Sequence, residues 1–215
     1  MEVVRHVRLS PGFLLLAAAL VFLDGESVLP WAVLAAAVHE LGHYAAVRLQ
    51  GGAVKELRLT ISGGEMDLDR RYPLTYSGEL LSILAGPGAS LLLALAALRL
   101  GDGREEGWFL AGLSLCLGWF NLLPVWPLDG GRALLLILTG FLPHDTAVAG
   151  VRACSLALGA GLLAGGISLL VQGGGATLAM MGCWLLLCQF RERKMGKKAC
   201  IFPCSVVSYF GFNKG

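Results

Sequence analysis

Two histidines and a glutamate stand close together in an otherwise apolar stretch of the chain: His39, Glu40 and His43. The histidines are four residues apart, so on an α-helix both imidazoles leave the same face one turn apart, where they can share one tetrahedral metal ion such as Zn²⁺. Glu40 is turned by about 100° from His39, where a carboxylate can reach a water molecule at the metal without being a ligand itself. The spacing therefore indicates a metal centre with a general base beside it.

The composition places these residues in an unusual environment. Hydrophobic residues make up 56% of the 215 residues, charged residues only 15%, and the mean hydropathy is +0.70. These values exclude an ordinary soluble domain and indicate the lipid bilayer as the surrounding medium, with no nucleic-acid partner expected. Ionisable groups at membrane depth are costly and usually functional, which favours a metal site over surface histidines beside a solvated glutamate.

The apolar runs predict an all-α polytopic membrane protein with about six transmembrane helices and a small membrane-associated β-hairpin. Residues 1–190 form one integral-membrane domain in this prediction. A short basic leader, Met1–Ser10, precedes the first span, which is read as a retained helix because no small-residue cleavage site follows Leu23. The expected spans are 12–23, 28–49, 77–100, 108–126, 146–171 and 176–190.

Three further segments have weaker signals. Residues 53–69 alternate apolar and polar side chains around a glycine turn, which predicts the β-hairpin, with a solvated loop as the alternative. In the fifth span, Gly161 and Gly165 are expected to form a close-packing face. Residues 191–215 are predicted to be a basic tail, disordered or on the membrane surface, in which Cys200 and Cys204 make only a weak metal pair.

A second informative stretch follows the fourth span. Pro124 and Pro127 cannot both sit in a regular helix interior, so the backbone is expected to unwind there. Unwound backbone at membrane depth is tolerated only when it is buried in protein or lines a wet cavity. Asp129 lies on this segment and needs a partner, which a metal ion held by the two histidines would provide. The alternative is that Asp129 caps a helix over residues 130–142.

Three motifs together resemble the site-2 protease family of intramembrane metalloproteases, over roughly residues 28–142. They are His39-Glu40-Leu41-Gly42-His43, then Gly86-Pro87-Gly88-Ala89-Ser90, then Asn121-Leu122-Leu123-Pro124-Val125-Trp126-Pro127-Leu128-Asp129-Gly130. Packing is the favoured explanation for the residues of the second motif. The compact size is similar to the branch of the stage IV sporulation metalloprotease, although the C-terminal CBS domain common there is not expected in the roughly two dozen residues after Arg191.

The resemblance implies a role for each candidate residue. His39, His43 and Asp129 would bind zinc, Glu40 would activate water, and Asn121 would hold the substrate carbonyl or its oxyanion. The implied activity is an intramembrane endopeptidase that cuts a membrane-tethered protein near its cytoplasmic boundary and releases a soluble factor, such as a sporulation sigma-factor precursor. Membrane regulatory proteins would be further partners.

The rival interpretation is a metal-handling membrane protein, either a transporter or a sensor, without proteolytic activity. A transporter would be expected to show ligands strung along a path or two repeated halves. The sequence shows one cluster and no internal repeat.

The positive charges predict the orientation in a bacterial inner membrane. With six spans, 15 of the 17 Lys and Arg residues fall on the side that carries both termini, leaving only Arg99 and Arg104 opposite. The positive-inside rule then places both termini and the hairpin in the cytoplasm. His43 is nearer the end of its span that leads to Gly51, so the metal is expected to open toward the cytoplasmic face.

Overall fold

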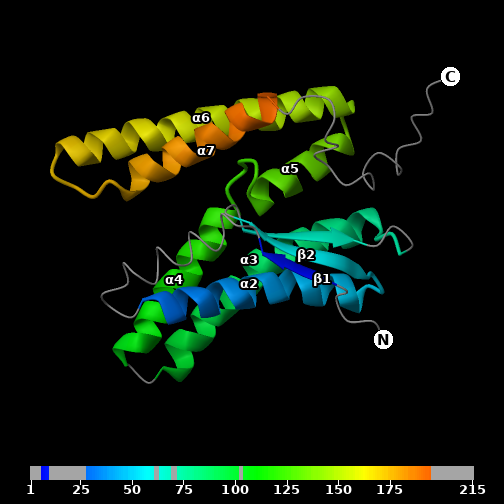
Figure 1. Cartoon of the computed structure of the whole chain (residues 1–215), viewed down its shortest axis with the longest axis horizontal. Helices are drawn as coiled ribbons and strands as arrows, with labels where there is room; N and C mark the ends of the chain where they lie inside the picture. The colour runs from blue at the N-terminus through cyan, green and yellow to red at the C-terminus, as the bar shows by residue number, and fades with distance from the viewer. Residues whose placement is uncertain (1–5, 10–27, 61–62, 69–71, 102–103, 195–215) are drawn as a thin grey trace. The chain divides into compact units, whose positions relative to one another are not determined.

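The structure of the chain is a computed structural model that describes residues 6–9, 28–60, 63–68, 72–101 and 104–194 (Figure 1). The chain divides into two compact units, Met1–Phe120 and Asn121–Gly215. Helices predominate among the described residues of both units, in agreement with the mainly helical prediction. The first expected span, 12–23, and most of the expected tail lie outside the described residues.

Helix α2, Leu29–Leu49, carries the histidines and Glu40. Pro30 stands in its first turn, where a proline is tolerated because the missing N–H would have had no partner within the helix. The helix ends in a turn at Gly51, whose φ of +80° is a left-handed conformation that favours glycine. The local sequence thus sets both ends of the helix that presents the metal-competent side chains.

Helix α3, Tyr76–Leu100, begins after Thr75, whose side-chain oxygen accepts a hydrogen bond from the Gly78 N–H (3.2 Å). It lies alongside α2 (Figure 1). A Cβ atom at Gly42 of α2 would lie 2.5 Å from the Ala85 carbonyl oxygen and 2.6 Å from the Ala89 Cβ. The absence of a side chain at Gly42 therefore lets α3 approach the helix that carries the histidines.

We expect Gly42→Ala to lower the free energy of unfolding by about 1–3 kcal/mol, because the added methyl group must push α2 and α3 apart. Gly88→Ala on α3 is the matched control, since a Cβ there would have no heavy atom of the described part of the chain within 4 Å. Thermal unfolding of the two variants in detergent micelles checks the difference. A Gly42→Ala protein as stable as Gly88→Ala would contradict the close contact.

A three-stranded sheet of order β1-β2-β3 accompanies these helices: β1 is His6–Leu9, β2 is Val54–Thr60 and β3 is Gly63–Leu68. Strands β2 and β3 pair antiparallel within the range of the expected hairpin, with Leu57 opposite Met66. Val47, Val54 and Leu74 form a hydrophobic cluster that joins the end of α2 to β2.

Strand β1 pairs parallel with β2, which corrects the sequence analysis. The sheet therefore has a third strand, which lies in the segment that was predicted to be a basic leader. The predicted fold of helices with a two-stranded hairpin has to be extended by this strand. Four residues are too few for an alternation signal, and a parallel partner some fifty positions away leaves no turn signature in the sequence.

Helix α4, Glu105–Asn121, packs against α3 through Gly118, where a Cβ would lie 3.2 Å from both the Pro87 carbonyl oxygen and the Ser90 Cβ. The helix ends at Asn121, short of the expected span end at 126. Residues 122–128 are turns and irregular backbone, where Pro124 and Pro127 were expected to break the helix.

The second unit contains α5 (Asp129–Thr139), α6 (His144–Val171) and α7 (Thr177–Lys194). Helices α6 and α7 lie side by side (Figure 1). Buried Leu135, Ala147 and Val151 join α5 to α6.

Two expectations for this unit are wrong. The N-cap position of α5 is occupied by Leu128 and not by Asp129, which is the first residue of the helix, and the helix ends at Thr139. Among the residues that the structure describes, no heavy atom lies within 4 Å of a Cβ built at Gly161 or Gly165, whereas Gly166 and Gly182 are where α6 and α7 approach closely. A pattern of small residues does not by itself show which helix face is covered.

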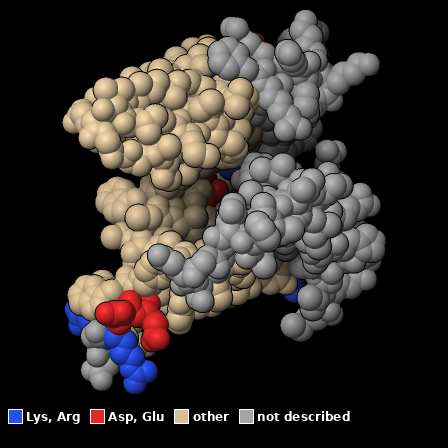
Figure 2. Space-filling model, turned by 60° about the vertical axis from the view of Figure 1, so that its left-hand side comes forward, with Lys and Arg blue, Asp and Glu red and all other residues tan. Residues whose placement is uncertain are grey.

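Two of the described helices, α3 and α6, are long and apolar enough to cross a membrane, and α7 contains a shorter apolar stretch, Thr177–Gln189. Helix α2 has sufficient length, but its two histidines and Glu40 lower its mean hydropathy. Figure 2 shows few Lys, Arg, Asp or Glu side chains among the described residues on the face that it draws. Such a face is suited to contact with lipid.

Candidate metal centre

The two imidazoles of α2 face one another. The Nε2 atoms of His39 and His43 are 3.3 Å apart, and the rings meet edge to face with centroids 4.9 Å apart. His39 is buried, with 5% of its surface exposed, and His43 is half-buried. The four-residue spacing on a helix therefore produces the convergence that the sequence predicted.

The other nitrogen of each ring is held by α3. His43 Nδ1 donates to the backbone carbonyl of Ser82 (2.8 Å), because a carbonyl oxygen can only accept. In a neutral imidazole this leaves Nε2 with a lone pair, which is the atom that a metal ligand must offer. His39 Nδ1 lies 2.9 Å from the Ser90 hydroxyl, which can donate to that nitrogen or accept from it.

The Ser90 hydroxyl can therefore hydrogen-bond to His39 both with and without a metal ion bound to the two histidines. Without a metal, Ser90 can donate to His39 Nδ1 while the His39 Nε2–H points at His43. With a metal bound, the hydroxyl would instead accept from His39 Nδ1–H, which would leave the Nε2 lone pairs of His39 and His43 available as ligands.

The donor spacing fits a tetrahedral ion. Two nitrogens bound to Zn²⁺ at about 2.0–2.1 Å with a tetrahedral angle between them lie roughly 3.3–3.4 Å apart. The observed separation of the two Nε2 atoms is 3.3 Å. The histidine pair could therefore hold zinc with little movement.

Gly86 makes room for His43. A Cβ atom at Gly86 would overlap the Nε2, Cε1 and Cδ2 atoms of the His43 ring. Helix packing was the favoured role for the motif Gly86-Pro87-Gly88-Ala89-Ser90. The motif also contacts both histidines: Gly86 leaves room for the His43 ring, and Ser90 hydrogen-bonds to His39.

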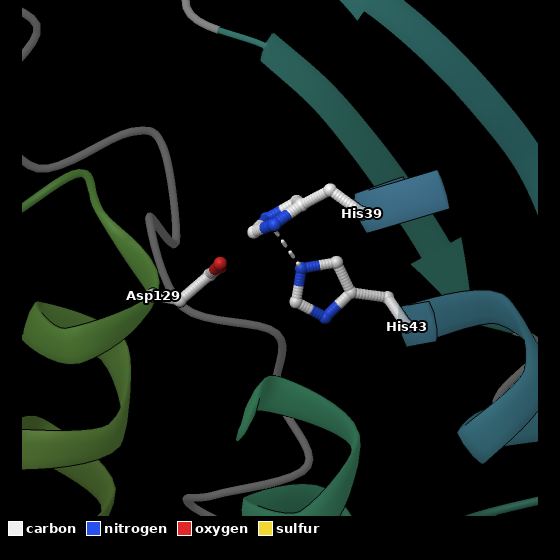
Figure 3. Close-up of side chains that lie close together, drawn as sticks. All are labelled: His39, His43 and Asp129. Atoms are coloured by element: carbon white, nitrogen blue, oxygen red, sulfur yellow. Dashed lines mark hydrogen bonds between the residues drawn. The ribbon is translucent and has the colours of Figure 1, made fainter. Parts of the chain in front are cut away.

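Asp129 completes the group of metal-competent side chains. It is the first residue of α5, and 6% of its surface is exposed. His39 and His43 of the first unit and Asp129 of the second are three side chains that could each offer one ligand atom to a metal ion (Figure 3). Two imidazoles and a carboxylate form a donor set typical of catalytic zinc sites, which keep the fourth position open.

The two remaining candidate residues lie on the same helices as sequence analysis placed them. Glu40 follows His39 on α2 and is half-buried. Asn121 is the last residue of α4, also half-buried, immediately before the irregular segment that leads to Asp129. The metal group itself includes neither residue.

Comparison with known proteins identifies the family. The model of Peptidase family M50 matches residues 106–163, which include Asn121 and Asp129. Stage IV sporulation protein FB of Bacillus subtilis is 30% identical over 152 residues, which are 68% of this chain and 52% of that protein. The chain belongs to peptidase family M50. This confirms the resemblance found in the three motifs.

Two proteins of Methanocaldococcus jannaschii extend the comparison of this M50 member. A zinc metalloprotease is 33% identical over 144 residues, which are 60% of this chain and 41% of that protein. The solved structure of a site-2 protease shares the fold, with a TM-score of 0.67 and 22% identity, covering 94% of this chain and 98% of that one. The chain spans about half the length of the two sequence relatives.

Sequence reasoning missed two partners of the histidines in this M50 member. Ser90 stood in a quoted motif, and its position four residues after Gly86 on one helix face was the available signal. Ser82 acts through its backbone carbonyl, which any residue provides, so its side chain gave no signal for this contact.

Proposed function

We propose that this chain is a zinc-dependent intramembrane endopeptidase that cleaves membrane-tethered proteins. The observation that carries the proposal is the pair of facing imidazoles of His39 and His43, whose Nε2 atoms lie 3.3 Å apart on the helix that also carries Glu40. Asp129 is the third residue able to bind a metal ion. The M50 relatives named as zinc metalloproteases support it. The face with few charged side chains and the two long apolar helices support a location in the membrane.

His39, His43 and Asp129 would hold the zinc ion, and α3 orients the histidines through Ser90 and the Ser82 carbonyl. When bound, zinc supplies Lewis acidity toward the scissile carbonyl and toward water. The positions of the two imidazole rings are set by α3, because Gly42 and Gly86 allow this helix to lie close to α2.

Glu40 is the general base and then the general acid. It takes a proton from the water whose oxygen attacks the peptide carbonyl carbon, and it returns that proton to the amide nitrogen as the C–N bond breaks. Asn121 donates from its side-chain amide to the carbonyl oxygen as negative charge develops there. The second proton of the water also passes to the amine, so the products are a carboxylate and an ammonium group, and atoms and protons balance.

Co-expression with a panel of membrane-tethered precursors tests the function. Each precursor joins a soluble domain to a single transmembrane helix. We expect at least one to be cut within or beside its helix, with the cut abolished by a membrane-permeant zinc chelator and restored by zinc. Metal uptake across the membrane without cleavage of any precursor would instead favour a transporter.

Asn121→Leu keeps the volume of the side chain but removes the hydrogen-bond donor. We expect the mutant to retain bound zinc and to lose roughly 100-fold or more in cleavage rate, the usual cost of one oxyanion donor. Cleavage rate and zinc content of the purified protein are the measurements. Full activity would leave packing as the only role of Asn121.

The excess of Lys and Arg on one side supports an inner-membrane orientation with both termini and strand β3 in the cytoplasm. The soluble factor, such as a sporulation sigma-factor precursor, is then released into the cytoplasm. Labelling of Gly63→Cys in a cysteine-free background checks this orientation. We expect protection from membrane-impermeant reagents in intact cells, and labelling only from outside would overturn both the orientation and the release side.

A further inference from the structure

Both backbone groups of Trp126 are bonded by side chains of other helices. The Trp126 N–H donates to Ser155 Oγ of α6 (2.9 Å), and the Trp126 carbonyl accepts from Gln189 Nε2 of α7 (2.5 Å). Ser155 Oγ donates in turn to the Val151 carbonyl (2.8 Å). Trp126 belongs to the irregular segment 122–128, outside the regular hydrogen-bond ladder of a helix.

Ser155 and Gln189 are unusual in their surroundings. Both lie in apolar helices and are almost fully buried, with 0% and 3% of their surfaces exposed. A polar side chain in such a helix is costly unless it is hydrogen-bonded, and it usually has a function. Unwound backbone at membrane depth must also find partners within the protein. The two side chains meet this need at one residue.

The segment between Trp126 and Asp129 is short and hydrogen-bonded. Only Pro127 and Leu128 intervene, and the Leu128 N–H donates to the Val125 carbonyl (2.8 Å). The Arg132 N–H then donates to the Leu128 carbonyl (3.1 Å), which joins the segment to the first turn of α5. A shift of Trp126 is therefore transmitted to the residue that begins α5, Asp129.

Contacts behind the segment fix it further. A Cβ at Gly131 would lie 2.5 Å from the Val125 carbonyl carbon and 2.6 Å from the Trp126 nitrogen. A Cβ at Gly130 would overlap the Leu122 carbonyl. The Arg132 guanidinium lies 5.7 Å from the centre of the Trp126 ring, within the range of a cation–π contact. The start of α5 thus packs directly on the backbone that Ser155 and Gln189 hold.

We propose that Ser155 and Gln189 are positioning residues for Asp129: they clamp the Trp126 backbone and thereby set the place of the carboxylate that binds zinc. This inference rests on the proposed function. Loss of a hydrogen-bond partner that orients a metal ligand typically weakens metal affinity by roughly 10- to 100-fold. Ser155 and Gln189 act one step further along the chain, through the backbone, and should affect metal binding without contacting the metal.

The test uses the full-length chain in detergent micelles, with Ser155→Ala and Gln189→Met as separate variants. Ser155→Ala removes one oxygen, and Gln189→Met keeps the length of the side chain but removes the donor. Zinc affinity is measured by chelator competition, and Co²⁺ absorption reports the ligand geometry. We expect affinity to fall roughly 10- to 100-fold and the cobalt spectrum to change. If one variant fails to fold, the other decides.

Matched controls lie on the same unit. Ser168 and Gln172 are a serine and a glutamine that are exposed at the end of α6, where the Gln172 side chain donates to the Ser168 hydroxyl (3.1 Å) and not to the Trp126 backbone. Ser168→Ala and Gln172→Met should keep the affinity and the cobalt spectrum of the unmodified chain. Unchanged affinity and spectrum in both clamp variants would overturn the inference.

Hydrogen exchange of the metal-free protein separates this inference from the proposed function. The Trp126 amide should exchange faster in Ser155→Ala than in Ser168→Ala, whether or not zinc binds. An unmodified chain that binds no zinc would refute the proposed function. The exchange rate of the Trp126 amide would still test whether Ser155 and Gln189 hold the Trp126 backbone. Unchanged exchange at Trp126 would overturn the clamp even in a chain that binds zinc.

Discussion

Replacing Asp129 by alanine is expected to remove most of the bound zinc and all detectable cleavage. Asp129 supplies the third ligand in the proposed site, and its loss leaves only the histidine pair, whose Nε2 atoms are 3.3 Å apart. Affinity should fall by more than the roughly 10- to 100-fold that follows loss of a group orienting a ligand. Zinc content of the purified variant, measured by elemental analysis, gives the result directly.

Asp145→Ala is the control for that experiment. Asp145 is also in the first turn of its helix, α6, but it is exposed. Both substitutions remove a carboxylate from a helix N-terminus, so the effect on helix stability is matched. Unchanged zinc content and unchanged cleavage in Asp129→Ala would exclude Asp129 as a ligand and leave its role at the start of α5 as purely structural.

Glu40→Gln should have the opposite combination of effects: normal zinc content and a severe loss of activity. The amide has nearly the shape of the carboxylate but cannot take a proton from water, and general acid–base catalysis typically contributes roughly 10²- to 10⁴-fold. Cleavage is followed on any precursor that the unmodified chain cuts, with zinc content measured on the same preparation.

Glu105→Gln makes the same chemical change at an exposed position in the first turn of α4 and should leave cleavage unchanged. The Glu40→Gln result also separates the two functional classes. If Glu40→Gln cleaved at the rate of Glu105→Gln, Glu40 would not be the base, and a metal-handling role for the site would become the better explanation.

The local geometry around the two histidines and before Asp129 was predictable from the sequence because it is encoded locally. His39 and His43 converge through helix geometry alone, and the two prolines predict the break before Asp129. The third ligand was proposed from its chemical need for a partner, although its alternative role as a helix cap could be rejected only when Leu128 was found at that position.

The supporting contacts were not predictable because they join residues distant in sequence. Ser155 and Gln189 are single polar residues in apolar helices, and no spacing links either to Trp126. Strand β1 is too short for a period-2 signal and depends on a partner beyond α2. Tertiary packing, and not local pattern, decides these features.

X-ray absorption at the zinc edge of the purified full-length chain tests the central claim most directly and requires no known substrate. The account predicts one zinc ion with two imidazole nitrogens and carboxylate or water oxygens at about 2.0–2.2 Å. The cysteines described in the structure, Cys116, Cys154, Cys183 and Cys188, are free thiols and should contribute no sulfur ligand. A sulfur shell at about 2.3 Å, or no bound zinc, would contradict a catalytic centre built from His39, His43 and Asp129.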